Sequence, residues 1–211
     1  MSNRYARILA VGGAAVLAAT LAAAPALAGT TWTVQPGGAI TATSSLFTFK
    51  DHVTRTLITC RSSPTAVGTL KHGSGLPGHR AGSLSAVSIG DCFGPGGGPA
   101  FVLKPAGLPW HLNLSSYNAA TGVARGTISH LAIMVGKTCS FVIDGTSSAA
   151  SDGWVRFTYT DSTGGLTVLA ASGNLHFWNV SAGCLGLFNT GDRAGLSATF
   201  TVSPEQAMTS P

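Results

Sequence analysis

Charged residues are scarce in this chain. Asp, Glu, Lys and Arg together make up 9% of 211 residues, and only seven residues are acidic. The basic residues are scattered singly, so the net charge of +5 reflects the shortage of acids and no basic patch. Nucleic-acid binding needs clustered Lys and Arg with aromatic residues between them. The sequence therefore predicts that nucleic acid is not a partner.

Sequence motifs for hydrolysis are also missing. The chain has no Gly-x-Ser-x-Gly turn; the closest feature is Ser74, in a Gly-rich segment with His72 and His79 nearby. Glycoside hydrolysis needs two carboxylates facing one cleft. Four of the seven acids lie in turns, where Asp bonds to the local backbone: Asp144, Asp152, Asp161 and Asp192. We predict no catalytic residue, and keep a small secreted hydrolase of envelope polysaccharide as the alternative.

Metal-ligand spacing is likewise missing. The six histidines form no His-x-His or His-x-x-x-His pair, and the four cysteines include no Cys-x-x-Cys pair. Aspartates at the alternate positions of a calcium loop do not occur either. The sequence therefore predicts no metal and no cofactor.

Long apolar runs are missing except at the N-terminus. A short basic segment is followed there by an apolar stretch over 8–24, and Ala26-Leu27-Ala28 matches the small-x-small cleavage pattern. An uncleaved anchor is the alternative, but the Pro25 break before this pattern favours cleavage. We predict a signal peptide over 1–28 and a soluble, secreted protein from Gly29, with no membrane span after cleavage.

Four cysteines in an exported chain are most simply two disulfides. Three pairings are possible, and we favour Cys60–Cys92 with Cys139–Cys184, because sequential pairing staples each half of the chain to itself. Each disulfide closes a loop of a few tens of residues. Loop entropy gives about 4 kcal/mol for such a loop.

Short segments of alternating apolar and polar residues are abundant instead. No eleven-residue window of the mature chain keeps a helical period with caps, and about a dozen short strands are separated by Gly, Pro and Asp turns. The apolar content of 45% argues against disorder. We predict one all-β domain over 29–203, an antiparallel jelly-roll-like sandwich with a barrel as the alternative, and a flexible tail over 204–211.

The stretch over 92–133 is predicted to cross the centre of this domain as a strand, a corner and a hairpin. Pro109 cannot donate to a ladder, which places it at a strand start. Alternation then points Trp110, Leu112 and Leu114 to the core and His111, Asn113 and Ser115 outward. In the strand over 54–60 we expect both faces to be buried. We also expect a loop over 72–79 and a strand over 184–189.

Aromatic residues supply the main candidate for binding. Alternation places Trp154 and Arg156 opposite Val155 and Phe157, and an exposed Trp is a platform for stacking sugar rings. Burial of both faces is the alternative. His111 and Asn113 are further binding candidates. We predict a non-enzymatic extracellular or envelope domain, structural or binding, with a carbohydrate-binding module as a second alternative; the partner would be an envelope glycan or a hydrophobic extracellular ligand.

Several segments resemble secreted, uncharacterised all-β proteins of actinobacteria of the Streptomyces type. A looser resemblance, over the stretch from Cys92 to Trp110, is to exported activator-of-alkane-oxidation proteins. The resemblance implies export and an all-β fold, and it brings no catalytic motif. Its segments are 56–60, 92–96, 107–113, 116–122, 173–180 and 197–204.

Overall fold

The computed structural model describes residues 31–61, 63–95 and 100–211, so the predicted signal peptide over 1–28 lies outside the described residues. Strands make up 63% of the described chain and helices 4%. Eight strands form a barrel: β2 (Gly38–Asp51), β4 (Thr65–Leu70), β6 (Gly82–Ser88), β9 (Trp110–Asn118), β10 (Val123–Gly136), β12 (Gly153–Thr160), β13 (Gly165–Gly173) and β15 (Ala194–Ser203).

The barrel is closed and antiparallel, in the order β2, β4, β6, β9, β10, β12, β13, β15 and back to β2. The all-β prediction is confirmed. Its preferred sandwich is replaced by the barrel that was the alternative. Two pairings, β2 with β4 and β10 with β12, join the sheet to itself. Closure leaves no unpaired edge in this ring of strands.

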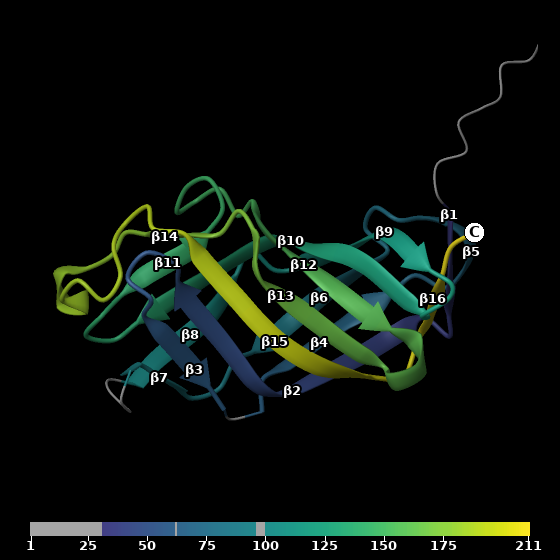
Figure 1. Cartoon of the computed structure of the whole chain (residues 1–211), viewed down its shortest axis with the longest axis horizontal. Helices are drawn as coiled ribbons and strands as arrows, with labels where there is room; N and C mark the ends of the chain where they lie inside the picture. Colours follow the sequence, from purple (N-terminus) through teal and green to yellow (C-terminus); the bar gives the residue numbers. More distant parts are fainter. Residues whose placement is uncertain (1–30, 62, 96–99) are drawn as a thin grey trace, which may run out of the picture.

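One end of the barrel is covered by a small sheet of β1 (Thr31–Gln35), β5 (Gly73–Pro77) and β16 (Ala207–Thr209) (Figure 1). Two predictions are wrong here. The loop expected over 72–79 contains β5, which pairs with β1, and the tail expected to be flexible contains β16, which pairs with β1 on its other side. Both pairings are long-range, so no local pattern announces them.

A buried glutamine holds the C-terminal segment in place. Gln206 is 1% exposed, and its Oε1 accepts a hydrogen bond from the Gly37 N–H at 2.8 Å. The Tyr159 hydroxyl donates to the Gln206 carbonyl at 3.0 Å and accepts from the Gln206 N–H at 2.8 Å. The C-terminal segment is therefore fixed across one end of the barrel.

The other end of the barrel continues into a second region, which we call the disulfide lobe (Figure 1). It contains β3 (Leu57–Cys60), β7 (Cys92–Phe93), β8 (Ala100–Ala106), β11 (Phe141–Asp144) and β14 (His176–Trp178). The C-terminal halves of β2 and β10 complete it, because β2 pairs there with β3, and β10 pairs with β8 and β11. An isolated β-bridge between His176 of β14 and Arg193, the residue before β15, connects the lobe to the barrel.

Both predicted disulfides are present in this lobe. Cys60–Cys92 joins β3 to β7 across 32 residues, and Cys139–Cys184 joins the β10–β11 connection to the 3-10 helix η3 (Ala182–Cys184) across 45 residues. The predicted strand over 184–189 is wrong, since turns follow η3. Burial of both faces at β3 is also wrong: Ile58 is fully buried, but Leu57 is 42% exposed.

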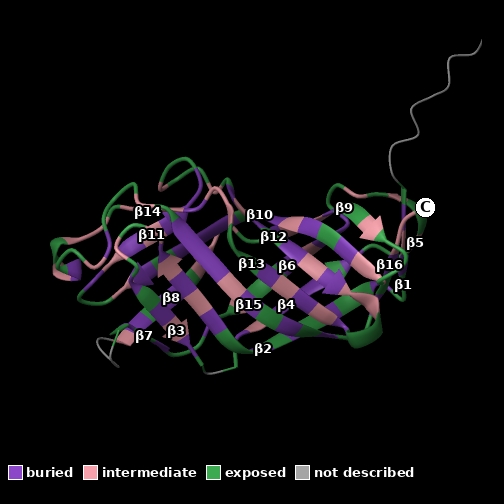
Figure 2. Ribbon diagram, in the orientation of Figure 1, coloured by how far each residue is buried: buried purple, intermediate pink, exposed green. Residues whose placement is uncertain are grey.

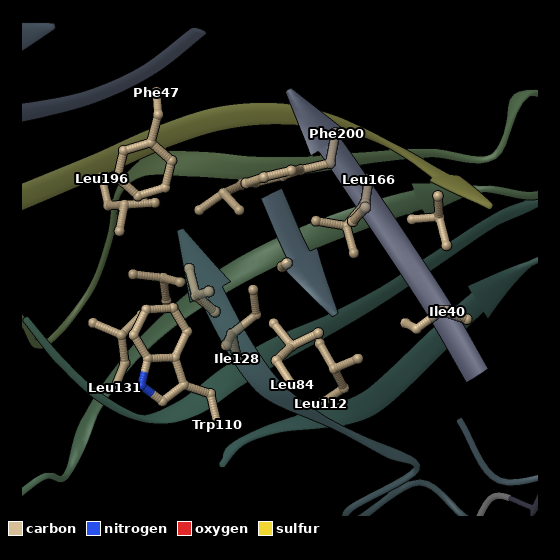
Figure 3. Close-up of a pocket in the computed structure, with 16 residues that line it drawn as sticks. Ile40, Phe47, Leu84, Trp110, Leu112, Ile128, Leu131, Leu166, Leu196 and Phe200 are labelled. Carbon is tan, nitrogen blue, oxygen red and sulfur yellow. The ribbon is translucent and has the colours of Figure 1, made fainter. Parts of the chain in front are cut away.

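Buried and exposed residues alternate along the barrel strands, as Figure 2 shows. Trp110, Leu112 and Leu114 point inward as predicted, each less than 10% exposed. The interior is lined only by apolar side chains from surrounding strands (Figure 3) and leaves a cavity of about 40 Å³. That volume is far below the roughly 300–1,000 Å³ that is typical of ligand pockets. The barrel interior is therefore a packed core.

Candidate functional site

The outer surface of β9, β10 and β12 carries three aligned rows of polar and aromatic side chains. Strand register sets these rows, since neighbouring strands place paired residues side by side about 4.8 Å apart. Each row takes one residue from each strand, and each is half-buried or exposed. The rows are His111–Ser129–Trp154, Asn113–Thr127–Arg156 and Ser116–Arg125–Thr158. We call these nine residues the Trp154 face.

A shallow groove of about 460 Å³ runs over this face. Trp154 and Arg156 line it, with the Arg156 guanidinium carbon 5.9 Å from the centroid of the Trp154 ring. Arg125 and Thr127 lie across from them on β10, and Leu169 of β13 supplies an apolar border. The groove thus combines an aromatic surface, two cations and several hydroxyl groups.

The groove floor depends on the absence of a side chain at Gly126. A Cβ atom there would lie 2.0 Å from the Asn113 carbonyl oxygen and 2.7 Å from the buried Phe157 ring. The register between β9 and β10 shifts at this close approach, because Arg125 pairs with Ser116 and Gly126 with Leu114, which leaves Ser115 of β9 as an extra residue. The Ser115 hydroxyl donates to the Arg125 carbonyl at 3.0 Å and ties the shifted segment to β9. These contacts hold the backbone of Arg125 beside the groove.

Asn113 organises the centre of the face. Its Nδ2 donates to the Ser129 hydroxyl at 2.9 Å and to the Thr127 hydroxyl at 3.3 Å. Its Oδ1 accepts the Arg80 backbone N–H at 2.9 Å, which holds the loop after β5 against β9. Because these contacts occupy both ends of the amide, Asn113 acts as a positioning residue.

Histidines gather at one end of the face. The rings of His111 and His130 lie 5.6 Å apart, and His79 and Arg80 are close enough to act on His111 electrostatically. Burial lowers the pKa of His111, and the positive charges of Arg80, His130 and His79 lower it further. No group of three or more metal-ligating side chains occurs within the described ranges.

The four binding candidates taken from the sequence, Trp154, Arg156, His111 and Asn113, all lie on this one face. Sequence reasoning missed the contribution of β10, namely Arg125, Thr127, Ser129 and His130. Alternation along 123–129 was a usable signal, since Arg125, Thr127 and Ser129 are on one side of the strand. Their alignment with Trp154 required the long-range pairing of β10 with β12.

No acid is among the nine residues of the Trp154 face, and two nearby aspartates, Asp144 and Asp152, bond to local backbone N–H groups. Asp144 is fully buried, and its side chain accepts the N–H groups of Gly145, Ser151, Asp152 and Gly153 at 2.7–3.2 Å. Neither the groove nor the barrel cavity is lined by an acid. Ser74, the other residue considered for hydrolysis, is exposed on β5.

Asp152 accepts both the N–H of Thr146, at 2.8 Å, and its hydroxyl. These bonds lower the pKa of Asp152, which keeps the carboxylate ionised and directed at Thr146.

Within the described part of the chain, no helix is long and apolar enough to span a membrane. Comparisons with family models, curated proteins and solved structures found no match to this chain. The resemblance to actinobacterial secreted proteins thus stays a prediction.

Proposed function

We propose that this protein is an exported, non-enzymatic β-domain that binds a carbohydrate polymer of the cell envelope through the Trp154 face. One observation carries the proposal. The barrel aligns a half-exposed Trp with hydroxyl and guanidinium groups along one groove. Aromatic rings stack on the apolar faces of sugars, while polar groups around the ring bond to sugar hydroxyls.

Export is supported by the N-terminal sequence pattern and by the two disulfides, which persist mainly in oxidising compartments. N-terminal mass spectrometry of the protein secreted by its own cells should give a chain beginning at Gly29. A mature chain that retains residues 1–28 would contradict export by cleavage.

Binding fits this geometry better than the alternative of hydrolysis. A glycosidase needs two carboxylates on either side of the bond it cleaves. The Trp154 face contains hydroxyl, amide, imidazole and guanidinium groups and no carboxylate. Its groove is also open, as expected for a surface that holds a polymer along its length.

The test is retention of the protein on purified cell walls, comparing Trp154→Ala with the wild type. We expect roughly a five-fold loss of affinity or more, because a stacked ring contributes roughly 1–3 kcal/mol by analogy with base–aromatic stacking. Phe93→Ala is the matched control, since Phe93 is an aromatic residue 42% exposed on the disulfide lobe. Equal retention of Trp154→Ala and the wild type would refute the proposal, provided that circular dichroism shows both folded.

A further inference from the structure

We infer that the polymer held on the Trp154 face is anionic, and that protonation of the adjacent histidines strengthens its binding in mildly acidic conditions. This inference rests on the proposed function and specifies its ligand class. The face joins two exposed arginines in the groove to a cluster of His79, Arg80, His111 and His130 at its end.

Arg125 and Arg156 occupy diagonal positions on neighbouring strands. Thr127 pairs with Arg156, and Arg125 pairs with Thr158. The backbones of such diagonal positions lie about 7–8 Å apart in an antiparallel pair. A guanidinium group presents its N–H donors as a planar fork that matches a carboxylate or a phosphate. Two such forks beside a stacking ring suit consecutive acidic units of a polymer better than neutral hydroxyls.

The surroundings of the two arginines favour a negative ligand. None of the nine residues of the Trp154 face is acidic, although seven acids are available in the chain. Asp152, which immediately precedes β12, directs its carboxylate to Thr146. The field over the groove is therefore set by cations, and an anionic polymer would be concentrated there.

The histidine cluster makes this field depend on pH. His111 faces Ser83 on β6 and Ser129 on β10, both neutral, and the charged or titratable groups acting on it are Arg80, His130 and His79. No carboxylate contributes to the lowered pKa of His111. Protonation adds positive charge beside Ser129, whose other neighbour is Trp154. A bound polyanion would favour the protonated imidazole, so binding should tighten as the pH falls into the acidic range below the ordinary histidine value.

The experiment compares two polymers with the same sugar backbone, polygalacturonate and its fully methyl-esterified form, by calorimetry in low salt at pH 7.5 and 5.5. Polygalacturonate stays ionised at both pH values. Carboxyl groups titrate near pH 4, which is about 1.5 pH units below the lower of the two values. We expect it to bind at least ten-fold more tightly than the ester, with a further three-fold gain or more at pH 5.5. A poly(glycerol phosphate) arm shows whether phosphate serves as well as carboxylate.

Two sets of variants locate the effect. Arg125→Gln/Arg156→Gln should lose at least ten-fold in affinity for polygalacturonate, whereas Arg55→Gln, an exposed arginine on the β2–β3 hairpin, should lose little. His111→Gln/His130→Gln should keep the affinity at pH 7.5 and lose the gain at pH 5.5. Folding of each variant is checked by its thermal unfolding.

The outcomes separate this inference from the proposed function. Equal binding of polygalacturonate and its ester, both weakened by Trp154→Ala, would overturn the anionic ligand and keep a sugar-binding face. Polyanion binding that Trp154→Ala leaves unchanged would refute the proposed face itself. An undiminished gain at pH 5.5 in His111→Gln/His130→Gln would overturn the role of the histidines.

Discussion

The barrel and the disulfide lobe share β2 and β10, yet they are stabilised differently. The barrel interior is mostly aliphatic and contains a small cavity. The lobe interior is aromatic: Phe101, Phe141, Phe177 and Phe188 contact one another with ring centroids 4.9–6.3 Å apart. Both disulfides are in the lobe.

Strand length explains this difference. The strands unique to the lobe include β7 with two residues and β14 with three, whereas the barrel strands have six to fourteen. Short strands make few ladder hydrogen bonds, so they need other restraints. Aromatic contacts and covalent links supply these in the lobe, while closure of the sheet supplies them in the barrel.

The largest predicted effect is therefore loss of a disulfide. Cys139→Ser/Cys184→Ser should lower the free energy of unfolding by about 4 kcal/mol, the loop-entropy value for a 45-residue loop. Hydrogen exchange measured by mass spectrometry should accelerate first in β11 and β14. Equal acceleration in β4 and β13 of the barrel would contradict a separate source of stability for the lobe.

Matched alanine substitutions should act in opposite directions in the two regions. Ala66 lines the barrel cavity, so Ala66→Val should fill space and stabilise by about 1 kcal/mol. Ala194, the first residue of β15, is 4% exposed, and its N–H donates to the carbonyl of Leu175, which precedes β14 of the lobe, at 2.8 Å. Ala194 does not line the barrel cavity. Ala194→Val should therefore overpack and destabilise by about 1–3 kcal/mol.

Urea denaturation of both variants measures this contrast. A loss of stability in both would show that the cavity cannot accept the two methyl groups. A gain in both would show that the lobe is packed no more tightly than the barrel.

The smallest predicted effect concerns Asp161, in the 3-10 helix η2 (Asp161–Thr163), whose carboxylate contacts Met208 of β16. Burial raises its pKa, although the carboxylate accepts bonds from the Met208 N–H and the Tyr117 hydroxyl. The folded state thus holds this proton to a higher pH than the unfolded chain does. Stability from Asp161 is present below the unfolded pKa of about 3.9 and is lost as pH rises through the folded pKa.

Asp161→Asn should remove this loss. Comparing urea midpoints of the variant and the wild type at intervals from pH 3.5 to 6 isolates the contribution, because Asp152 titrates with the opposite sign in both proteins. A difference between the two proteins that stays constant with pH would contradict the raised pKa of Asp161.

Local patterns were sufficient for much of this fold. Alternation placed Trp110 inward and His111 outward, and cysteine order predicted both disulfides. What failed depended on distant partners. The pairing of β5 and β16 with β1, and the closure of β10 on β12, bring together segments that carry no local sign of one another.

The same limit applies to the site. Trp154 and Arg156 stood out because strand alternation exposes them, and His111 and Asn113 because they alternate with a core Trp. Their meeting on one face depended on register with β10, which also brings Arg125 beside them. A period of two residues identifies which side chains point outward, but it does not identify which strand lies next to them.

The length of β10 has a mechanical consequence. Its first half carries Arg125, Thr127 and Ser129 on the Trp154 face, and its second half continues past a bulge at His130 into the disulfide lobe. Tension from a polymer gripped on that face would therefore pass along one strand into the covalently closed end of the molecule. The load would be resisted in shear by ladder bonds on both sides of β10, which suits a tether for a polymer under strain.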